Sequence, residues 1–493
     1  MATRVIPPRI LKTFRQKTIT TKPLNSAHPT LSATVAPFNF AEKPKPTFQK
    51  PTTNDYDSLL NFNDVEKLFS FVPTTRLFLS SAILHASAVE SMVDFGMWVM
   101  KSKLMEVEPF KGLILTAIKH TFYQHFCAGE DTTTACRTVQ LLNDAGLRGM
   151  LVYAVEDATD NKGCDRNLQC FLDTIEASRS ARPSSVSFNI VKITAICPLR
   201  ILERVSDLLR WQQKDHSFNL PWKQNSLPIF SDSSPLYHTR KRPEPLTVEE
   251  DRDLELGHER LQKLCQKSVE ANIPLLVDAE YTSVQPAIDY MTYSSAILHN
   301  KDDNPIVYGT LQTYLKDAKE RLLLITKAAE KMGIPMGFKL VRGAYMSSET
   351  KIANSLGYAS PIHNTIEDTH ACFNDCTSFM LEKIANGSGG VVLATHNVQS
   401  GKLAAAKAYD LGIEKVNHKL EFAQLLGMSE ALSFGLSNAG FQVSKYMPFG
   451  PVEIVIPYLL RRAEENRGLL SAAKSDRQLM RKELSRRLKG GII

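Results

Sequence analysis

Eight short apolar runs rich in β-branched residues, separated by long amphipathic stretches, limit the fold of this chain most strongly. Such an alternation is typical of parallel strands joined by crossover helices. The runs cover residues 149–156, 185–194, 274–280, 305–314, 337–345, 390–397, 421–428 and 441–448. Eight parallel strands match a closed (βα)8 barrel better than an open doubly wound sheet, which usually has fewer strands. The sequence therefore predicts an α/β fold with a barrel over residues 146–467.

The residues before the barrel fall into two segments. Residues 1–54 are rich in Pro, Ser, Thr and Asn, and the first 41 contain no acid. Those 41 residues hold six cations, which are Arg4, Arg9, Lys12, Arg15, Lys17 and Lys22. This composition is typical of an organellar import peptide followed by a linker. Residues 55–145 show apolar side chains at helical spacing, for example Val65, Leu68 and Val72, and predict a helical accessory region.

Two further segments depart from the barrel pattern. Residues 210–246 contain five prolines among polar residues and predict an insertion loop. Residues 468–493 predict a C-terminal helical tail, in which Met480 and three leucines stand beside basic residues. We expect this helix either to lie on a membrane surface or to close the barrel mouth.

Charge and cysteine content exclude several classes of function. The first 41 residues contribute +6 to the formal net charge of +7, so the remainder is close to neutral and no broad nucleic-acid surface is expected. No apolar run approaches the ~20 residues of a membrane-spanning helix. The eight cysteines form no CxxC pair, and His370, Cys372 and Cys376 are not spaced to converge on one ion. No metal site is predicted.

Polar residues follow the predicted strands, where a barrel enzyme carries its active site. Lys192 ends an apolar run, where an ammonium is costly unless it meets an anion. Singly, each residue can equally pair with a neighbour or cap a helix. Their shared position predicts a site made of Glu156, Lys192, Asp278, Gln312, Lys339, Arg342, Thr395, His396 and Tyr446.

Arg461 and Arg462 directly follow the apolar run 454–460, on the last predicted helix of the barrel. A guanidinium presents several donors in a rigid fork that suits a carboxylate. Such a pair can also be a solvated basic turn. Together with Lys192, the two arginines can enclose the carboxylate of a small acid. The chain has neither a GxGxxG after a strand nor a GxxxxGK[ST], so neither a Rossmann fold nor a P-loop is supported.

Six segments in register resemble the proline dehydrogenase family. They are 191–195 (VKITA), 276–280 (LVDAE), 339–345 (KLVRGAY), 394–397 (ATHN), 446–448 (YMP) and 458–462 (YLLRR). The resemblance covers residues 146–466 and, with the import peptide, is nearest to plant mitochondrial members. It implies a distorted (βα)8 barrel that binds FAD and oxidises L-proline to Δ1-pyrroline-5-carboxylate. It also implies ubiquinone as the electron acceptor, on the matrix side of the inner mitochondrial membrane.

The resemblance implies a role for each matching residue. The implied catalytic residues are Asp278 and Lys339. The implied substrate-binding residues are Lys192, Tyr345, Leu425, Tyr446, Arg461 and Arg462. The implied flavin-binding residues are Ala279, Gln312, Arg342, Gly343, Ala344, Thr395 and His396. Glu156 and Glu465 are implied to orient the two arginines.

Three other functions remain open at this point. A hydroxyproline dehydrogenase on the same scaffold would differ only in its pocket lining, and the bulk of Tyr446 favours proline. A barrel aldolase would use Lys192 or Lys339 as a Schiff-base nucleophile. A non-catalytic binding protein is disfavoured by the number of charges on one barrel face.

Overall fold

The computed structural model describes residues 60–468 and 470–491, apart from the side chains of Lys101, Leu104 and residues 463–473. The chain from Lys50 onward forms one compact unit, so the helical region before the barrel is part of the same body as the barrel. The predicted import peptide and linker, residues 1–54, lie outside the described residues.

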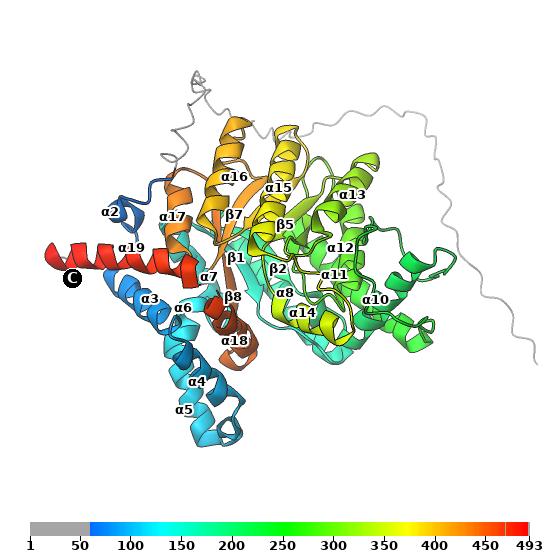
Figure 1. Cartoon of the computed structure of the whole chain (residues 1–493), viewed down its shortest axis with the longest axis horizontal. Helices are drawn as coiled ribbons and strands as arrows, with labels where there is room; N and C mark the ends of the chain where they lie inside the picture. Colours follow the sequence, from blue (N-terminus) through cyan, green and yellow to red (C-terminus); the bar gives the residue numbers. More distant parts are fainter. Residues whose placement is uncertain (1–59, 469, 492–493) are drawn as a thin grey trace, which may run out of the picture. The chain divides into compact units, whose positions relative to one another are not determined.

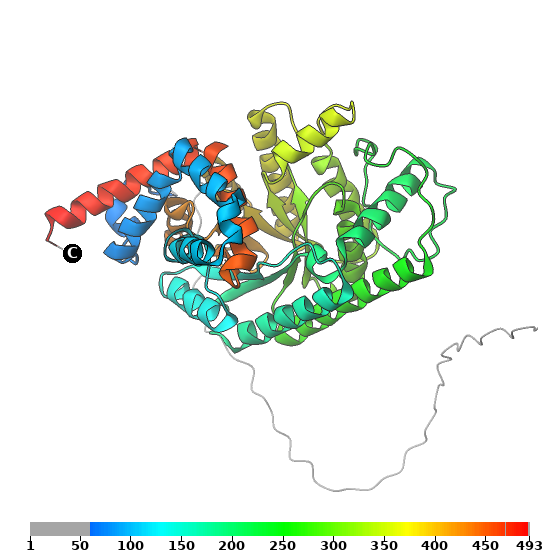
Figure 2. The same ribbon diagram turned by 90° about the horizontal axis from the view of Figure 1, so that it is seen from below.

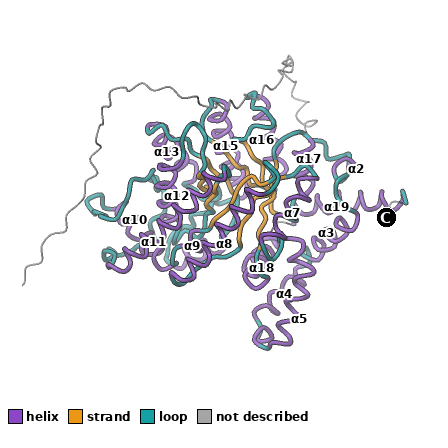
Figure 3. The backbone as a smooth tube through the Cα atoms, turned by 180° about the vertical axis from the view of Figure 1, so that it is seen from behind, coloured by secondary structure: helices purple, strands orange, loops and turns teal. Residues whose placement is uncertain are grey.

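Eight parallel strands close into a barrel with helices around it (Figures 1 and 3). The strands are β1 (Arg148–Tyr153), β2 (Val186–Val191), β3 (Leu275–Val277), β4 (Val307–Gln312), β5 (Gly337–Val341), β6 (Gly390–Ala394), β7 (Leu420–Leu425) and β8 (Val443–Phe449). Each strand pairs with its neighbour in chain order, and β1 closes the barrel on β8, with Met150 opposite Tyr446. The predicted barrel is confirmed.

Most of the helices that follow the strands cover the outside of the barrel, whereas the last two, α18 (Val452–Gly468) and α19 (Leu470–Lys489), pack against the helices that precede it. The others are α8 (Asn161–Ser180), α9 (Ile193–Ile196), α10 (Leu199–Lys214), α11 (Val248–Ala271), α12 (Gln285–His299), α13 (Ala318–Lys331), α14 (Met346–Ser355), α15 (Ile366–Ala385), α16 (Val398–Asp410) and α17 (Glu430–Asn438). Side-chain caps fix several of their starts. Thr247 and Glu250 form a reciprocal capping box at the start of α11.

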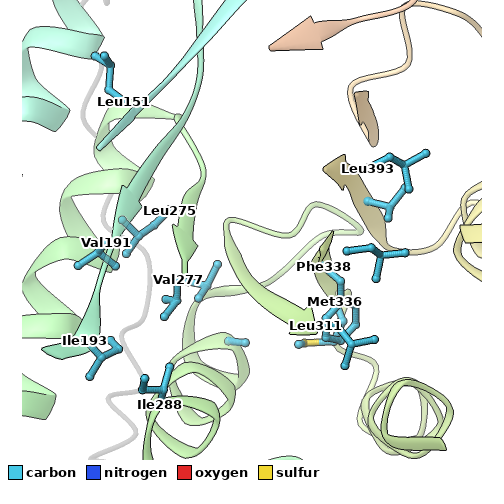
Figure 4. Close-up of a cluster of buried hydrophobic side chains, with 14 of the residues drawn as sticks. Leu151, Val191, Ile193, Leu275, Val277, Ile288, Leu311, Met336, Phe338 and Leu393 are labelled. Carbon is cyan, nitrogen blue, oxygen red and sulfur yellow. The ribbon is translucent and has the colours of Figure 1, made fainter. Parts of the chain in front are cut away.

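Successive side chains of each strand point to opposite faces of the sheet, and this alternation produces two separate hydrophobic cores. Met150 and Val152 of β1 belong to the cluster inside the barrel, whereas Leu151 between them belongs to the layer between strands and helices. Figure 4 shows part of this outer layer, with Leu151, Val191 and Leu275 from neighbouring strands. At about 25 cal/mol per Å² of apolar surface, burial in these two layers is the main force that holds the barrel closed.

Seven of the eight strands, all except β8, end before the predicted apolar runs do. β3 ends at Val277, one residue before Asp278, and β5 ends at Val341, one residue before Arg342. The residues beyond each strand end therefore leave the hydrogen-bonded ladder and line the C-terminal mouth of the barrel. This is the part of the fold that positions the site.

The insertion begins five residues later than predicted, because α10 continues to Lys214. Arg210 accounts for the difference. Its buried guanidinium pairs with Asp207 at 3.3 Å and donates to the Ser283 carbonyl at 2.9 Å, so this stretch packs as helix. Residues 215–247 contain no helix or strand. They pack back on the barrel, where the Tyr237 ring stacks on Tyr358 at 5.3 Å.

The described helices before the barrel are α2 (Val65–Leu68), α3 (Thr74–Ala86), α4 (Glu90–Lys101), η1 (Lys103–Glu106), α5 (Glu108–Ile118), η2 (Lys119–Tyr123), α6 (Gln124–Phe126) and α7 (Thr132–Asp144). The helix η2 is a single π-helical turn, and it ties this region to the loop between β8 and α18. There the Tyr123 hydroxyl donates to the Gly450 carbonyl at 2.7 Å. The predicted helical region is thus joined to the end of the barrel that carries the site.

The predicted C-terminal helix is α19, and it packs against α2, α3 and α17 (Figure 1). Met480 is buried in the main core, and the Arg487 guanidinium donates to the carbonyls of Phe69 and Val72 at 2.8 and 2.7 Å. Packing within the chain therefore occupies the apolar side of this helix. None of the described helices has the length and apolarity that a membrane crossing requires.

Candidate active site

Charged side chains from several strand ends meet the last barrel helix. Arg461 of α18 reaches Glu156, which follows β1, through two hydrogen bonds of 2.5 and 3.0 Å. The other side of this carboxylate lies 3.2 Å from the ammonium of Lys192, which follows β2. Burial alone would raise the pKa of Glu156, but the charges of Lys192 and Arg461 lower it to about 2. Glu156 is therefore a carboxylate shared by two cations, Lys192 and Arg461.

Lys192 is buried and keeps its charge. Burial by itself would lower its pKa, but the acidic groups around it, Tyr345, Glu156 and Glu280, raise the pKa of Lys192 well above its ordinary value. Because Tyr345 is a neutral phenol at neutral pH, we attribute the effect to the two carboxylates. A fixed ammonium at this depth suits an anion and cannot act as a free amine.

Asp278 accepts hydrogen bonds from two groups on opposite sides of the barrel mouth. Lys339 of β5 forms an ion pair with Asp278 Oδ1, and the Tyr446 hydroxyl of β8 donates to Oδ2 at 2.8 Å. The Lys339 ammonium also lies 5.3 Å from the centre of the Tyr446 ring. Burial, reinforced by the Asp278 charge, raises the pKa of Tyr446 well above its ordinary value, so the phenol stays protonated and donates.

Arg462 does not share the contacts of Arg461. Its guanidinium lies 5.2 Å from the centre of the Tyr458 ring. Its positive charge also contributes to the lowered pKa of His396. The predicted partner Glu465 lies outside the described side chains. The structure thus brings Arg461 into the Glu156 pair and leaves Arg462 on the side of β6 and β7.

His396 is a neutral imidazole that holds the backbone of a predicted pocket residue. Burial, with the charges of Lys445 and Arg462, lowers the pKa of His396 to about 3. Its Nε2 atom accepts a hydrogen bond from the Leu425 amide at 3.2 Å, which assigns the ring proton to Nδ1. The neighbouring Thr395 hydroxyl accepts from the Asn397 amide at 3.0 Å. These two residues therefore shape the ends of β6 and β7.

Arg342 is a partly buried guanidinium with no carboxylate in ion-pair distance among the described residues. Its two Nη atoms reach His370 at 2.8 Å and Ser400 at 2.5 Å, and its plane lies 4.5 Å from the Phe373 ring centre. Its Nε atom is buried without a hydrogen-bond partner in the described part of the chain. Burial lowers the pKa of Arg342 to about 10. Such a cation fits a phosphate or another anion of a bound group.

Gln312 also keeps an unused polar atom. Its Nε2 donates to the Glu280 carbonyl at 2.9 Å and to the Tyr314 hydroxyl at 2.7 Å. Its Oε1 is buried and accepts from no described group. An orphaned acceptor beside an unpaired guanidinium is what a nucleotide-like cofactor with ring N–H groups and phosphates requires. Ala279, Gly343 and Ala344 have no polar side chain, so only their backbone can contribute.

Three non-glycine residues at the barrel mouth have left-handed backbone angles. Asp157 follows β1 with φ 55°, Tyr345 follows β5 with φ 59°, and Ser429 follows β7 with φ 51°. This conformation is costly for a side chain with a Cβ, and it persists at functional sites where the surroundings enforce it. At Tyr345 the strained turn directs the ring onto Tyr281, at 4.8 Å between ring centres.

The sequence prediction missed two buried acids beside the site. Glu280 accepts hydrogen bonds from the amide and hydroxyl of Thr194, at 3.2 and 2.7 Å. Glu349 of α14 accepts from the Thr282 amide at 2.8 Å. The strand period offered a signal for Glu280, because residues 278 and 280 share one side of an extended chain. No comparable signal points to Glu349, which reaches its partner only through the fold.

The family model described as proline dehydrogenase matches residues 135–475. The chain belongs to the proline dehydrogenase family. It is therefore an oxidoreductase, and the barrel, with the strand ends that carry the charged cluster, lies within the matched region.

Two curated relatives from Arabidopsis thaliana match most of the chain. It is 56% identical to proline dehydrogenase 1, mitochondrial, over 100% of both chains. It is 60% identical to proline dehydrogenase 2, mitochondrial, over 87% of this chain and 91% of that one. The resemblance to plant mitochondrial members is confirmed.

A solved structure supports the fold of this family member. The chain is similar to proline utilization A from Bdellovibrio bacteriovorus with a TM-score of 0.57 and 19% identity. The match covers 82% of this chain and 42% of that longer chain, so this chain spans less than half of the solved one. At this identity the likeness concerns the fold alone.

Proposed function

We propose that this chain oxidises L-proline to Δ1-pyrroline-5-carboxylate with FAD as its cofactor and ubiquinone as the electron acceptor. The observation that carries the proposal is the charged cluster at the mouth of a proline dehydrogenase-family barrel. There Arg461 and Lys192 share Glu156, beside the Asp278–Tyr446 hydrogen bond.

Substrate binding follows from the chemistry of this cluster. The carboxylate of proline would pair with Lys192 and Arg461, which share Glu156, and with Arg462, the next residue of α18. Tyr446, Leu425 and Tyr345 would enclose the apolar ring of proline. Tyr446 is fixed by its bond to Asp278, and Leu425 is fixed through its amide by His396. A pocket with pre-positioned walls lowers the entropic cost of orienting the substrate.

FAD would be held by Arg342, which has no other anion, and by Gln312, whose Oε1 has no described donor. Backbone groups of Ala279, Gly343 and Ala344 would add contacts, and Thr395 and His396 would shape the adjoining wall. When bound, FAD supplies the hydride acceptor that the protein side chains lack. Lys339, in the middle of β5, adds a positive charge that is paired with Asp278.

The reaction also requires the removal of a proton from the ring nitrogen of proline. Forming the C=N bond of the product removes a hydride from the ring carbon and a proton from the ring nitrogen. Asp278 already accepts from Lys339 and Tyr446, so no described side chain in the cluster is a free strong base. We infer that the ammonium of proline loses its proton to solvent before the reaction. The rate should then rise with pH through the titration of the bound amine.

The state of the lysines argues against a barrel aldolase. A Schiff-base lysine must be a neutral amine in part of its population. The raised pKa of Lys192 keeps that group as an ammonium ion, and Lys339 is already engaged in its ion pair with Asp278.

We also propose a location on the matrix side of the inner mitochondrial membrane. The curated relatives carry the word mitochondrial in their names, and the basic, acid-free residues 1–41 suit an import peptide. In this view residues 1–54 serve delivery, and residues 146–467 form the catalytic barrel. A membrane location would bring the enzyme to a lipid-soluble quinone.

A visible absorption spectrum tests the proposal directly. The purified chain, supplied with FAD and kept without oxygen, should show flavin bands that bleach when L-proline is added. Bleaching with hydroxyproline and not with proline would reassign the substrate. Failure to retain any flavin would contradict the cofactor, and with it the oxidation chemistry.

A further inference from the structure

Exposed apolar side chains gather on the helices that precede the barrel. Ten of the twenty-four large hydrophobic side chains exposed in the described part of the chain lie between Phe71 and Phe122. Leu113 (69%), Phe78 (67%), Phe95 (65%), Phe71 (62%) and Trp98 (61%) are the most exposed of them. Single exposed hydrophobic residues are ordinary, but such a concentration in one region marks an interaction surface.

The centre of this region is the hairpin of α4 and α5, joined by η1, which extends away from the barrel (Figures 1 and 3). Met92, Phe95 and Trp98 follow one another at three-residue spacing on α4, and the rings of Phe95 and Trp98 stack at 6.0 Å. Phe110 and Leu113 have the same spacing on α5. At roughly 100 Å² exposed for each side chain, these five match the largest apolar patch of a typical monomer, about 300–600 Å².

The helices next to the hairpin are packed against the rest of the protein on their other side, so the exposed surface belongs to an ordered part of the fold. Ile83 of α3, Tyr123 of η2 and Phe126 of α6 are buried in one cluster with Val455 and Tyr458 of α18. Leu425 and Tyr446 pack against the same cluster. The exposed lobe is therefore continuous with the helix and the strand ends that form the proposed proline pocket.

A basic face lies beside the exposed apolar one, because α19 packs on α3 (Figures 1 and 2). Both acids among its described side chains, Asp476 and Glu483, are buried. The fully exposed charges of this helix are all basic, namely Lys474, Arg481, Lys482 and Lys489. Residues 90–119 hold four acids and four bases, so the hairpin itself adds apolar surface rather than net charge.

We propose that α3–α5 and α19 together form a docking surface for a bilayer that contains anionic phospholipid. The side chains of Phe95, Trp98 and Leu113 enter the boundary between headgroups and acyl chains, and the basic side chains of α19 contact lipid phosphates. Aromatic residues beside a basic face are the composition that suits this boundary. A second copy of the chain suits it less, because a two-fold contact would bring two basic α19 faces together.

The inference rests on the proposed function in one respect, since a membrane-resident quinone gives the surface its purpose. Its test does not depend on turnover. The full chain is sedimented with vesicles of phosphatidylcholine and cardiolipin, and with vesicles of phosphatidylcholine alone. Proline oxidation with a soluble dye is measured separately, without vesicles, and reports folding and the proposed function.

Three double variants test the apolar and the basic parts of the surface separately. Phe95→Ser with Trp98→Ser removes apolar contact, and Arg481→Ser with Lys482→Ser removes basic charge. The matched control is Ile366→Ser with Leu403→Ser, two residues that are 57% and 55% exposed on α15 and α16. None of these residues lies in the proposed pocket, so dye-linked oxidation should stay at the wild-type level in all three.

We expect the hairpin variant to bind both kinds of vesicle at least tenfold more weakly than wild type. The α19 variant should lose affinity several-fold for cardiolipin vesicles only, and added salt should reduce wild-type binding to the level of that variant. The control should bind as wild type does. Equal binding by the hairpin variant and wild type would overturn the proposal. The proposal would also be overturned if the wild-type chain did not bind vesicles and formed a dimer that was lost in the hairpin variant. A chain that binds vesicles but oxidises no proline would overturn the proposed function and leave this inference standing.

Discussion

Arg461 and Glu156 form a two-bonded ion pair, at 2.5 and 3.0 Å, that ties the last barrel helix to the end of the first strand. Lys192 contacts the second oxygen of the same carboxylate at 3.2 Å. One acid therefore orients two of the three cations that we propose to hold the carboxylate of proline. This arrangement makes substrate binding depend on a residue that need not touch the substrate.

Glu156→Gln should raise the KM for proline at least about tenfold, a loss of roughly 1.4 kcal/mol, and should change kcat less. The amide keeps the size of the side chain but no longer fixes the two cations. Steady-state kinetics with a soluble acceptor measures both constants. Glu176→Gln, which removes an exposed acid paired with Lys267, is the matched control. An unchanged KM would remove Glu156 from substrate binding.

Arg462→Met should lower kcat/KM for proline by at least roughly tenfold, in line with ~1.5–3 kcal/mol for a charged hydrogen bond. Arg462→Lys should recover part of the loss, because it restores the charge without the fork. Arg179→Met, on the exposed side of α8, controls for the loss of an arginine. A variant that retains flavin and turns over proline normally would show that Arg461 and Lys192 suffice.

The barrel and most of the charged cluster could be predicted because both depend on local pattern. Apolar runs specify strands, and polar residues just past them must fall at one end of a parallel barrel. Asp278 and Tyr446 stand 168 residues apart in sequence, yet they meet because β3 and β8 end at the same mouth.

Contacts that depend on side-chain rotamers and on packing between helices could not be predicted from the sequence. Nothing in the pattern separates Arg461 from Arg462, although only Arg461 binds Glu156. The C-terminal helix shows the same limit. Its leucines and cations are typical of a surface helix, whereas burial of Asp476 and Glu483 against its neighbours directs only the basic side outward.

Tyr446→Ser should raise the ratio of kcat/KM for hydroxyproline to that for proline by about tenfold, the effect of relieving one steric contact in a pocket. The ring of Tyr446 is held in place by its bond to Asp278, so it cannot swing aside for a hydroxyl on the substrate. Tyr446→Phe keeps the bulk of the ring but loses the bond that holds it in place, so its ratio should lie between those of wild type and the serine variant. Equal ratios for the serine variant and wild type would mean that another residue sets the preference.

Arg342→Gln should weaken flavin binding by at least roughly tenfold, or about 1.4 kcal/mol. The same change should not destabilise the flavin-free chain, because the guanidinium is partly buried without a described carboxylate partner. Flavin titration followed by absorbance measures the first effect, and urea unfolding of the flavin-free chain measures the second. Arg166→Gln, an exposed arginine of α8, is the control. Lower stability of the flavin-free variant with normal flavin affinity would assign Arg342 to the fold alone.

Glu280 should make the stability of the chain fall as pH rises towards 8. Burial, partly offset by the charge of Lys192, raises the pKa of this carboxyl from 4.5 to about 7. A raised pKa means that the folded chain favours the protonated form. The contribution of Glu280 to stability is therefore complete below about pH 4.5 and is lost as pH rises through about 7.

Glu280→Gln cannot ionise, and its amide can still serve the Thr194 contacts, so its stability should lack this pH dependence. Between about pH 5 and about pH 8, wild type should lose up to about 3 kcal/mol relative to the variant. Urea unfolding of both chains across this interval measures the difference, and Glu176→Gln should track wild type throughout. Parallel curves for Glu280→Gln and wild type would mean that Lys192 holds Glu280 as a carboxylate at every pH tested. The cation cluster would then be balanced by two permanent negative charges rather than by Glu156 alone.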